Sequence, residues 1–305
     1  MPRSPASLHL FAALSDEEAL TEARRRFPSA RVLRVRNGAP RELADVAEAL
    51  TAGPVAVALD ADVAAEHVAL QLVPLLGHGA HRLTVWSTVR LGELVAQLEG
   101  RGSAPAEMLI DRLEAADVVL IPDAGDERTP VEDRAMSLAR RLAPAARFGD
   151  DPVRFVPRDR PAPAWAQIAS SGRRSGIDAE GLEHVHLADP RPFHPERLLT
   201  VLAERLSPER VGRIACVRGI ARVATRPGSL IEFSGLGDEL HLGLLGADDE
   251  SPAGHELVLL GWGLRPAELE DALLEAVLSP DELLGGPQLW TELVDRLPLE
   301  ARSGG

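Results

Sequence analysis

The first half of the chain alternates short apolar runs with longer amphipathic segments, and this alternation restricts the fold more than any other feature. Strand-like runs at residues 31–36, 54–60 and 118–121 have the length of strands. Segments with helical patterns lie between such runs, for example residues 40–53 and 64–77. Strands that alternate with helices in this way predict βαβ units. We therefore expect an α/β domain with a doubly wound, mostly parallel sheet.

The second half of the chain has a different rhythm. Strand-like runs between residues 213 and 262 follow one another closely and are separated by Gly-containing turns, which indicates antiparallel hairpins. Helical segments flank these runs, so we expect a smaller α+β domain. The predicted order is an α/β domain over residues 1–157, a Pro-rich linker over 158–180, the α+β domain over 181–286, and an amphipathic helix with a polar tail over 287–305.

Charge and cysteine content exclude several classes of partner and site. The chain has 33 basic residues, all of them Arg, against 47 acidic ones, and the formal net charge of −14 repels a nucleic-acid backbone. The single cysteine, Cys216, allows neither an intrachain disulfide nor a zinc site built from several cysteines. No apolar stretch approaches the ~18 residues of a membrane span. We expect a cytoplasmic protein that contacts neither nucleic acid nor membrane.

Three segments of the second domain follow one another in a recognisable order. They are RPFHPERLLTVL at residues 191–202, the strand-like VRG at 217–219, and a helical segment at 266–278 that is followed by DEL at 281–283. This order resembles the C-terminal domain of the CobW family of P-loop GTPases and metallochaperones, in which an R-P-F-x-P-x-R helix, an R-x-K-G strand and an acidic D-x-E-L occur. The resemblance covers roughly residues 184–286. It implies a GTPase domain in front and a role in zinc or cobalt homeostasis or in cobalamin-related metabolism.

The expected GTPase domain lacks the residues that bind a nucleotide. The P-loop needs a Lys to reach the phosphates, and the chain contains no Lys. After the first strand, Ser15 and Glu18 are spaced as a capping box, and acidic residues 16–18 occupy the positive end of the helix dipole. The tetrapeptide PDAG at 122–125 stands where the guanine-reading Asn-Lys-x-Asp belongs. We therefore predict a pseudo-GTPase that binds no GTP, requires no cofactor and is not an enzyme.

Three aspartates are candidates for a ligand crevice in the first domain. Asp60, Asp62 and Asp123 each follow a predicted strand, and ligands of open α/β sheets bind outside the carboxyl ends of the strands. For Asp60 and Asp62 the alternative is that the side chains cap loops, because no His or Lys base accompanies them in the sequence.

Three histidines are candidates for a zinc or cobalt site in the second domain. His184 and His186 lie two apart on a predicted strand, so both imidazoles face one side, and His194 follows as a candidate third ligand. The C-x-C-C metal motif of the CobW family is absent. The alternative is a half-exposed strand face and a residue at a helix start.

The last predicted helix carries a candidate docking surface. Trp290, Leu293, Val294 and Leu297 fall at i, i+3, i+4 and i+7 and would form one apolar stripe. This stripe either packs on its own chain or docks a protein partner with Trp290 as the anchor. The sequence thus favours a non-catalytic, CobW-like accessory or protein-interaction factor. The alternative function is a metallochaperone that binds a metal or small ligand at an unconventional site.

Overall fold

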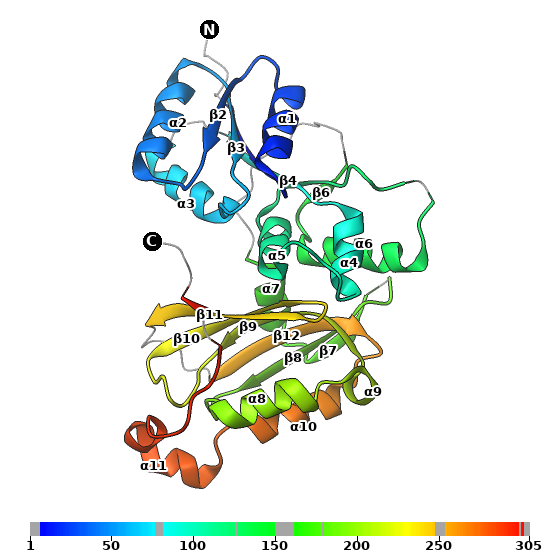
Figure 1. Cartoon of the computed structure of the whole chain (residues 1–305), viewed down its shortest axis with the longest axis vertical. Helices are drawn as coiled ribbons and strands as arrows, with labels where there is room; N and C mark the ends of the chain where they lie inside the picture. Colours follow the sequence, from blue (N-terminus) through cyan, green and yellow to red (C-terminus); the bar gives the residue numbers. More distant parts are fainter. Residues whose placement is uncertain are drawn as a thin grey trace. The chain divides into compact units, whose positions relative to one another are not determined.

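The structure is a computed structural model that describes residues 7–76, 82–125, 127–149, 162–178, 180–247, 254–298 and 300–301. It divides into two compact units (Figure 1). The first comprises Met1–Ala96 and Gly102–Ala164, and the second comprises Gln97–Arg101 and Trp165–Gly305. The predicted fold class, an α/β domain followed by an α+β domain, is confirmed.

The first unit contains a six-stranded sheet in the order β2-β3-β1-β4-β5-β6, and every pair in it is parallel. Its strands are β1 (Ser7–Ala12), β2 (Arg31–Val35), β3 (Val55–Leu59), β4 (Arg82–Thr88), β5 (Val118–Leu120) and β6 (Arg147–Phe148). Its helices are α1 (Asp16–Arg26), α2 (Pro40–Ala52), α3 (Ala65–Leu76), α4 (Leu91–Leu98), α5 (Ala106–Ala115) and α6 (Pro130–Leu142). The end of α4, from Gln97 onward, belongs to the second unit.

Helices cover both faces of this sheet, as a doubly wound fold requires (Figure 1). One core joins the strands to α2 and α3, through side chains such as Leu43 and Leu72. The other joins them to α1 through Ala19 and Ala23. All five residues of β3 are buried, because a central parallel strand is covered on both sides.

The second unit contains a seven-stranded sheet in the order β13-β11-β10-β9-β12-β8-β7, antiparallel except for the β11–β13 pair. Its strands are β7 (Ser175–Ile177), β8 (Glu183–Asp189), β9 (Arg213–Ala221), β10 (Ser229–Leu236), β11 (Glu239–Ala247), β12 (His255–Trp262) and β13 (Glu300–Ala301). Its helices are α7 (Ala164–Ser170), α8 (Pro195–Glu204), α9 (Pro208–Val211), α10 (Pro266–Ala276) and α11 (Pro280–Trp290). α8 and α10 pack on one face of the sheet through residues such as Leu198 and Leu269.

Part of the segment expected to be a linker has regular structure. Residues 162–178 include α7 and β7, and β7 adds to the sheet edge by pairing Gly176 with His184. A Cβ at Gly176 would lie 2.6 Å from Cε1 of His184, so a residue without a side chain fits this pairing. Residues 158–161 lie outside the described part of the chain.

The predicted helix over 287–297 is correct only for residues 287–290, which form the end of α11, and is wrong for the rest. α11 begins earlier, at Pro280, where Ser279 and Glu282 form a complete capping box, and it ends at Trp290. Gly286 interrupts it with a φ of 73°. From Leu293 to Pro298 the backbone is not helical, so the four apolar side chains do not form a helical stripe. The S-x-x-E signature at residues 279–282 was the signal for the true start.

No helix in the described part of the chain is long and apolar enough to cross a membrane.

Candidate functional site

The ends of the parallel strands in the first unit form the edge at which a nucleotide-binding fold holds its ligand. β3 and β5 run in the same direction in one sheet, so Asp60 and Pro122 follow strands that end at this edge, as predicted. α1 also begins here, directly after β1. We call the residues that follow β1, β3, β4 and β5 at these strand ends the carboxyl edge.

Asp60 is held by an ion pair with the neighbouring strand. Nη2 of Arg34 donates to Oδ2 of Asp60 at 2.9 Å, and the same guanidinium also bonds to Asp16 at the start of α1. The hydrogen bond to Asp60 raises the pKa of Arg34. The backbone N–H of Ala61 donates to Oδ1 of Asp16 at 2.8 Å. Asp60 and Asp16 are therefore joined through one Arg, whereas Asp62 is exposed in the turn that follows.

The first turn of α1 is closed by its own side chains. Oγ of Ser15 accepts the N–H of Glu18 at 3.2 Å, which is one half of the predicted capping box. The reciprocal half is wrong: the carboxylate of Glu18 accepts from Nη2 of Arg90 at 3.3 Å. Asp16, Glu17 and Glu18 all lie in this turn, so negative charge occupies the end of the helix dipole that would bind a phosphate.

A buried arginine lies next to this turn. Arg112, on α5, is 5% exposed, and its Nη2 donates to the carbonyl of Ala61 at 2.7 Å. Burial lowers the pKa of Arg112 to about 10, although the negative charge of Glu18 acts to raise this pKa. Neither Nη1 of Arg112 nor Oε2 of Glu18 has a hydrogen-bond partner among the described residues. The sequence prediction missed Arg112, although the signal was present: Leu109 and Leu113 place it on the buried face of its helix.

Asp123 caps a helix that follows a different strand. Its Oδ1 accepts the N–H of Leu91 at 2.7 Å and its Oδ2 accepts the N–H of Gly92 at 2.9 Å. These are N–H groups of the first turn of α4, which have no partner within the helix. A backbone hydrogen bond of 2.9 Å from Val89 to the carbonyl of Leu120 holds the two loops together. Asp123 thus has the geometry of a helix cap.

The three candidate histidines do not converge. His184 and His186 lie on the face of β8 opposite Val185 and Leu187, which point into the core beneath α8 and α10. His194 instead caps the N-terminus of α8, where its Nδ1 accepts the N–H of Arg197 at 3.5 Å. Within the described ranges, no group of three or more His, Cys, Asp or Glu side chains could hold a metal ion.

Two of these histidines have partners that explain their positions. Nε2 of His186 lies 3.2 Å from Oε1 of Glu256 on the adjacent strand β12. Burial and, to a smaller extent, the charge of Arg197 lower the pKa of His194.

Trp290, the candidate anchor of the docking surface, has a hydrogen-bond partner in its own chain. Its Nε1 donates to the carbonyl of Glu282 at 2.7 Å, and its side chain is half-buried.

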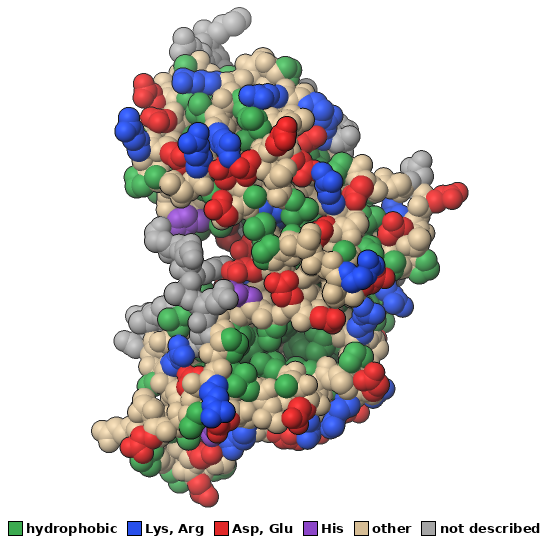
Figure 2. All heavy atoms as spheres, in the orientation of Figure 1, with side chains coloured by type: hydrophobic (Ala, Val, Ile, Leu, Met, Phe, Trp, Pro, Cys, Tyr) green, Lys and Arg blue, Asp and Glu red, His purple; other side chains and the backbone are tan. Residues whose placement is uncertain are grey.

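Ion pairing within the first unit extends beyond the carboxyl edge. In the view of Figure 2, acidic and basic side chains of this unit lie interspersed, with no large patch of one sign. Examples are the contacts of Arg25 and Arg26 with Glu22, at 2.9 and 3.0 Å. This distribution differs from the single-sign surface that attracts a charged ligand or nucleic acid.

Comparison with known proteins finds one family model that matches part of the second unit. Residues 182–277 match the family model of the cobalamin synthesis protein cobW C-terminal domain. Among solved structures, the Zn(II)-bound YjiA GTPase from E. coli is 12% identical, with 90% of this chain and 99% of that chain covered and a TM-score of 0.36. A Zn(II)-bound triple mutant of the YjiA GTPase is 11% identical, with the same coverage and a TM-score of 0.35. No curated protein matches the sequence.

Proposed function

We propose that this chain, in which residues 182–277 match the cobW C-terminal domain model, is a non-catalytic protein that acts through a protein partner in zinc or cobalt homeostasis or in cobalamin-related metabolism. The family match supports the setting. The closed first turn of α1 carries the proposal that the first unit is a pseudo-GTPase, because three carboxylates lie where phosphates would bind.

Phosphate binding at this turn would oppose existing interactions. A phosphate is stabilised at a helix N-terminus by free N–H groups and by the positive end of the dipole. Here Ser15 already accepts the N–H of Glu18, and Asp16 accepts both the N–H of Ala61 and a guanidinium N–H of Arg34. A nucleotide would have to displace these bonds and approach the charges of Glu17 and Glu18.

Guanine recognition is opposed in a similar way. In the PDAG tetrapeptide, Asp123 is the only side chain able to accept from a base, and both of its oxygens are bonded to α4. Turning Asp123 toward a base would leave the N–H groups of Leu91 and Gly92 without a cap, at a cost of about 1 kcal/mol. The carboxyl edge is therefore arranged to hold the fold rather than a nucleotide.

A titration with a fluorescent GTP analogue in the presence of Mg²⁺ tests the pseudo-GTPase proposal. We expect no saturable signal up to millimolar protein, and no phosphate release above the buffer rate. A P-loop GTPase measured in parallel is the positive control. Saturable micromolar binding with Mg²⁺-dependent turnover would show that the chain is an active GTPase.

The partner proposal needs a separate experiment. The full chain, tagged and purified from its native cells, should be recovered with a stoichiometric protein, and metal analysis should assign any zinc or cobalt to that protein. Recovery of the chain alone with one bound metal ion per molecule would instead favour the alternative, a metallochaperone. Substitution of His184 and His186 together by Asn would then show whether those side chains hold the metal.

A further inference from the structure

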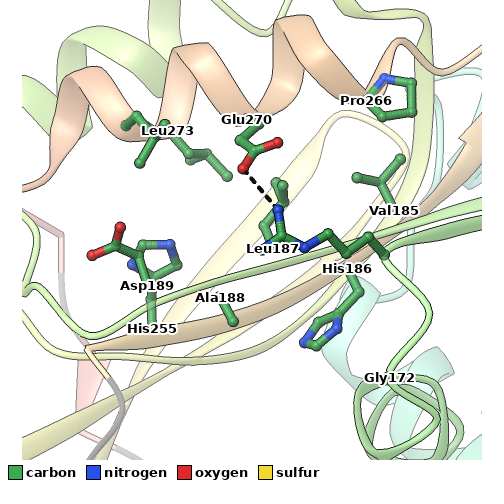
Figure 3. A pocket seen from close by; sticks show the side chains of 12 residues that line it. Gly172, Val185, His186, Leu187, Ala188, Asp189, His255, Pro266, Glu270 and Leu273 are labelled. Carbon is green, nitrogen blue, oxygen red and sulfur yellow. Dashed lines mark hydrogen bonds and ion pairs between the residues drawn. The ribbon is translucent and has the colours of Figure 1, made fainter.

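The second unit has a pocket of about 190 Å³ between α10 and the strand β8 (Figure 3). Pro266, Glu270, Leu273 and Leu274 line it from α10, at the i, i+4, i+7 and i+8 spacing of one helix face. The opposite wall is formed by residues 185–189 of β8. All lining residues lie within the second unit.

The apolar part of the pocket is continuous with the core of the unit. Val185, Leu187 and Leu273 line the pocket and also belong to the buried cluster beneath α8 and α10. Leu274 lines it from the outside and is 39% exposed. A pocket with these walls favours an apolar ring or chain, and its volume is below the ~300 Å³ typical of sites for drug-sized molecules.

One buried polar atom in the pocket, Nδ1 of His255, makes no hydrogen bond to a described residue. His255, the first residue of β12, is 3% exposed and lies beside Asp189 at one end of the pocket (Figure 3). Its ring stacks on Phe193 with the centroids 4.4 Å apart. Its Nδ1 is buried and makes no hydrogen bond to any residue that the structure describes. Buried polar atoms usually have a partner, so this nitrogen points to a ligand.

The imidazole of His255 is in the form that accepts a hydrogen bond. Burial lowers the pKa of His255 to about 4, so the ring is neutral at pH 7. A hydrogen bond between the ring and the backbone of Arg191 acts in the opposite direction and raises the pKa of His255. Because Nδ1 makes no hydrogen bond to a described residue, we assign the donor of that bond to Nε2, which leaves a lone pair on Nδ1.

The charged side chains around the pocket form ion pairs with each other, so the pocket does not favour an ionic ligand. Nη1 of Arg174 lies 3.3 Å from Oε1 of Glu270, and both side chains are exposed. Arg191 and Asp189 are paired at 2.8 Å. Each carboxylate is thus matched by a guanidinium, and an anion or cation would find no unpaired counter-charge among the described lining residues.

We propose that this pocket binds a small, uncharged, amphipathic molecule whose apolar part packs on Leu187 and Leu273 and whose hydroxyl or N–H group donates a hydrogen bond to Nδ1 of His255. The proposal concerns the second unit alone, so it does not depend on the absence of GTP binding in the first.

The test uses the full chain and two probes of similar shape, phenol and anisole, measured at pH 7.5 by protein-observed NMR titration. Phenol has the O–H donor and anisole lacks it. We expect phenol to bind about three- to tenfold more tightly, the ratio that one neutral hydrogen bond provides. In the variant His255→Phe, which keeps an aromatic ring against Phe193, this ratio should fall to about one while anisole affinity is unchanged.

A pair of leucine variants locates the binding site. Leu274→Trp fills the mouth of the pocket and should weaken both probes, whereas Leu284→Trp, at an exposed position of α11 outside the pocket, should change neither. Should His255→Phe fail to fold, the Nδ1 resonance of ¹⁵N-labelled His255 in the unsubstituted chain serves instead, since phenol should shift it and anisole should not. Equal affinity for the two probes, no binding, or insensitivity to Leu274→Trp would overturn the proposal.

Discussion

At the scale of single residues, the side chains that looked functional in the sequence are engaged in holding loops and helix ends. Asp123 caps α4 from another loop, and Asp60 shares Arg34 with Asp16. Asp62 and Asp123 are both exposed, and of these two only Asp123 accepts hydrogen bonds from a helix start. Whether an aspartate acts as a cap depends on the N–H groups that lie within hydrogen-bond distance of its carboxylate. Removing the carboxylate of Asp123 is therefore expected to affect stability more than removing that of Asp62.

We predict that Asp123→Ala lowers the free energy of unfolding by about 1–2 kcal/mol, because two N–H groups at the start of α4 lose their acceptor. The matched control is Asp62→Ala, an exposed aspartate of the same edge, which should change stability by less than about 0.5 kcal/mol. Urea denaturation of both variants checks the pair. Equal effects would mean that Asp123 is not a structural cap.

At the scale of elements, the C-terminal segment is fixed by contacts after its helix has ended. Oδ2 of Asp295 accepts from Oγ1 of Thr225 at 2.7 Å and from Nε of Arg226 at 2.9 Å. Leu297, two residues further, is 6% exposed and belongs to the core of the second unit. This segment therefore packs on its own chain, the first of the two alternatives for the residues around Trp290.

Leu297→Ala is expected to cost about 2–3 kcal/mol of stability, since it removes buried apolar volume from the core of the second unit. Val294→Ala is the control, because Val294 is 49% exposed and should contribute less than about 0.5 kcal/mol. Both values follow from urea denaturation monitored by tryptophan fluorescence. A small effect of Leu297→Ala would indicate that the segment detaches easily, and docking of a partner would become the better interpretation.

At the scale of the whole chain, each unit has its own core and its own neutral histidine, half-buried in the first unit and buried in the second. Burial lowers the pKa of His9 in the first unit and of His255 in the second to about 4. His9 stacks on Phe27 at 3.8 Å and accepts from Nε1 of Trp86 at 3.3 Å. Protonation of either ring thus opposes the folded state.

These depressed pKa values predict a loss of stability on acidification. Each histidine has a folded pKa below the unfolded value of ~6.5, so its contribution is fully present above that pH and is lost as pH falls toward 4. Between pH 7 and pH 5 we expect about 1–2 kcal/mol of loss per histidine. His255→Phe should reduce this pH dependence in urea titrations. An unchanged dependence would mean that His255 is not buried in its neutral form.

The sequence by itself determined the class of each unit and the absence of the Lys-containing P-loop motif. Hydrophobic periodicity decides which face of a helix or strand is buried, so the parallel sheet, the antiparallel hairpins and the apolar face of α10 could all be predicted. Missing Lys residues and the acidic start of α1 are local facts, and they need no tertiary structure to exclude a P-loop.

Only the tertiary structure decided which side chains meet. Arg34 joins Asp16 and Asp60, and Asp123 reaches α4, because parallel strands bring together loops that are tens of residues apart in the sequence. The same packing separates His194 from His184 and His186, and it places His255 beside α10. Periodicity assigns each residue to a face of its own element, whereas contacts between elements depend on strand order and loop path, which that periodicity does not encode.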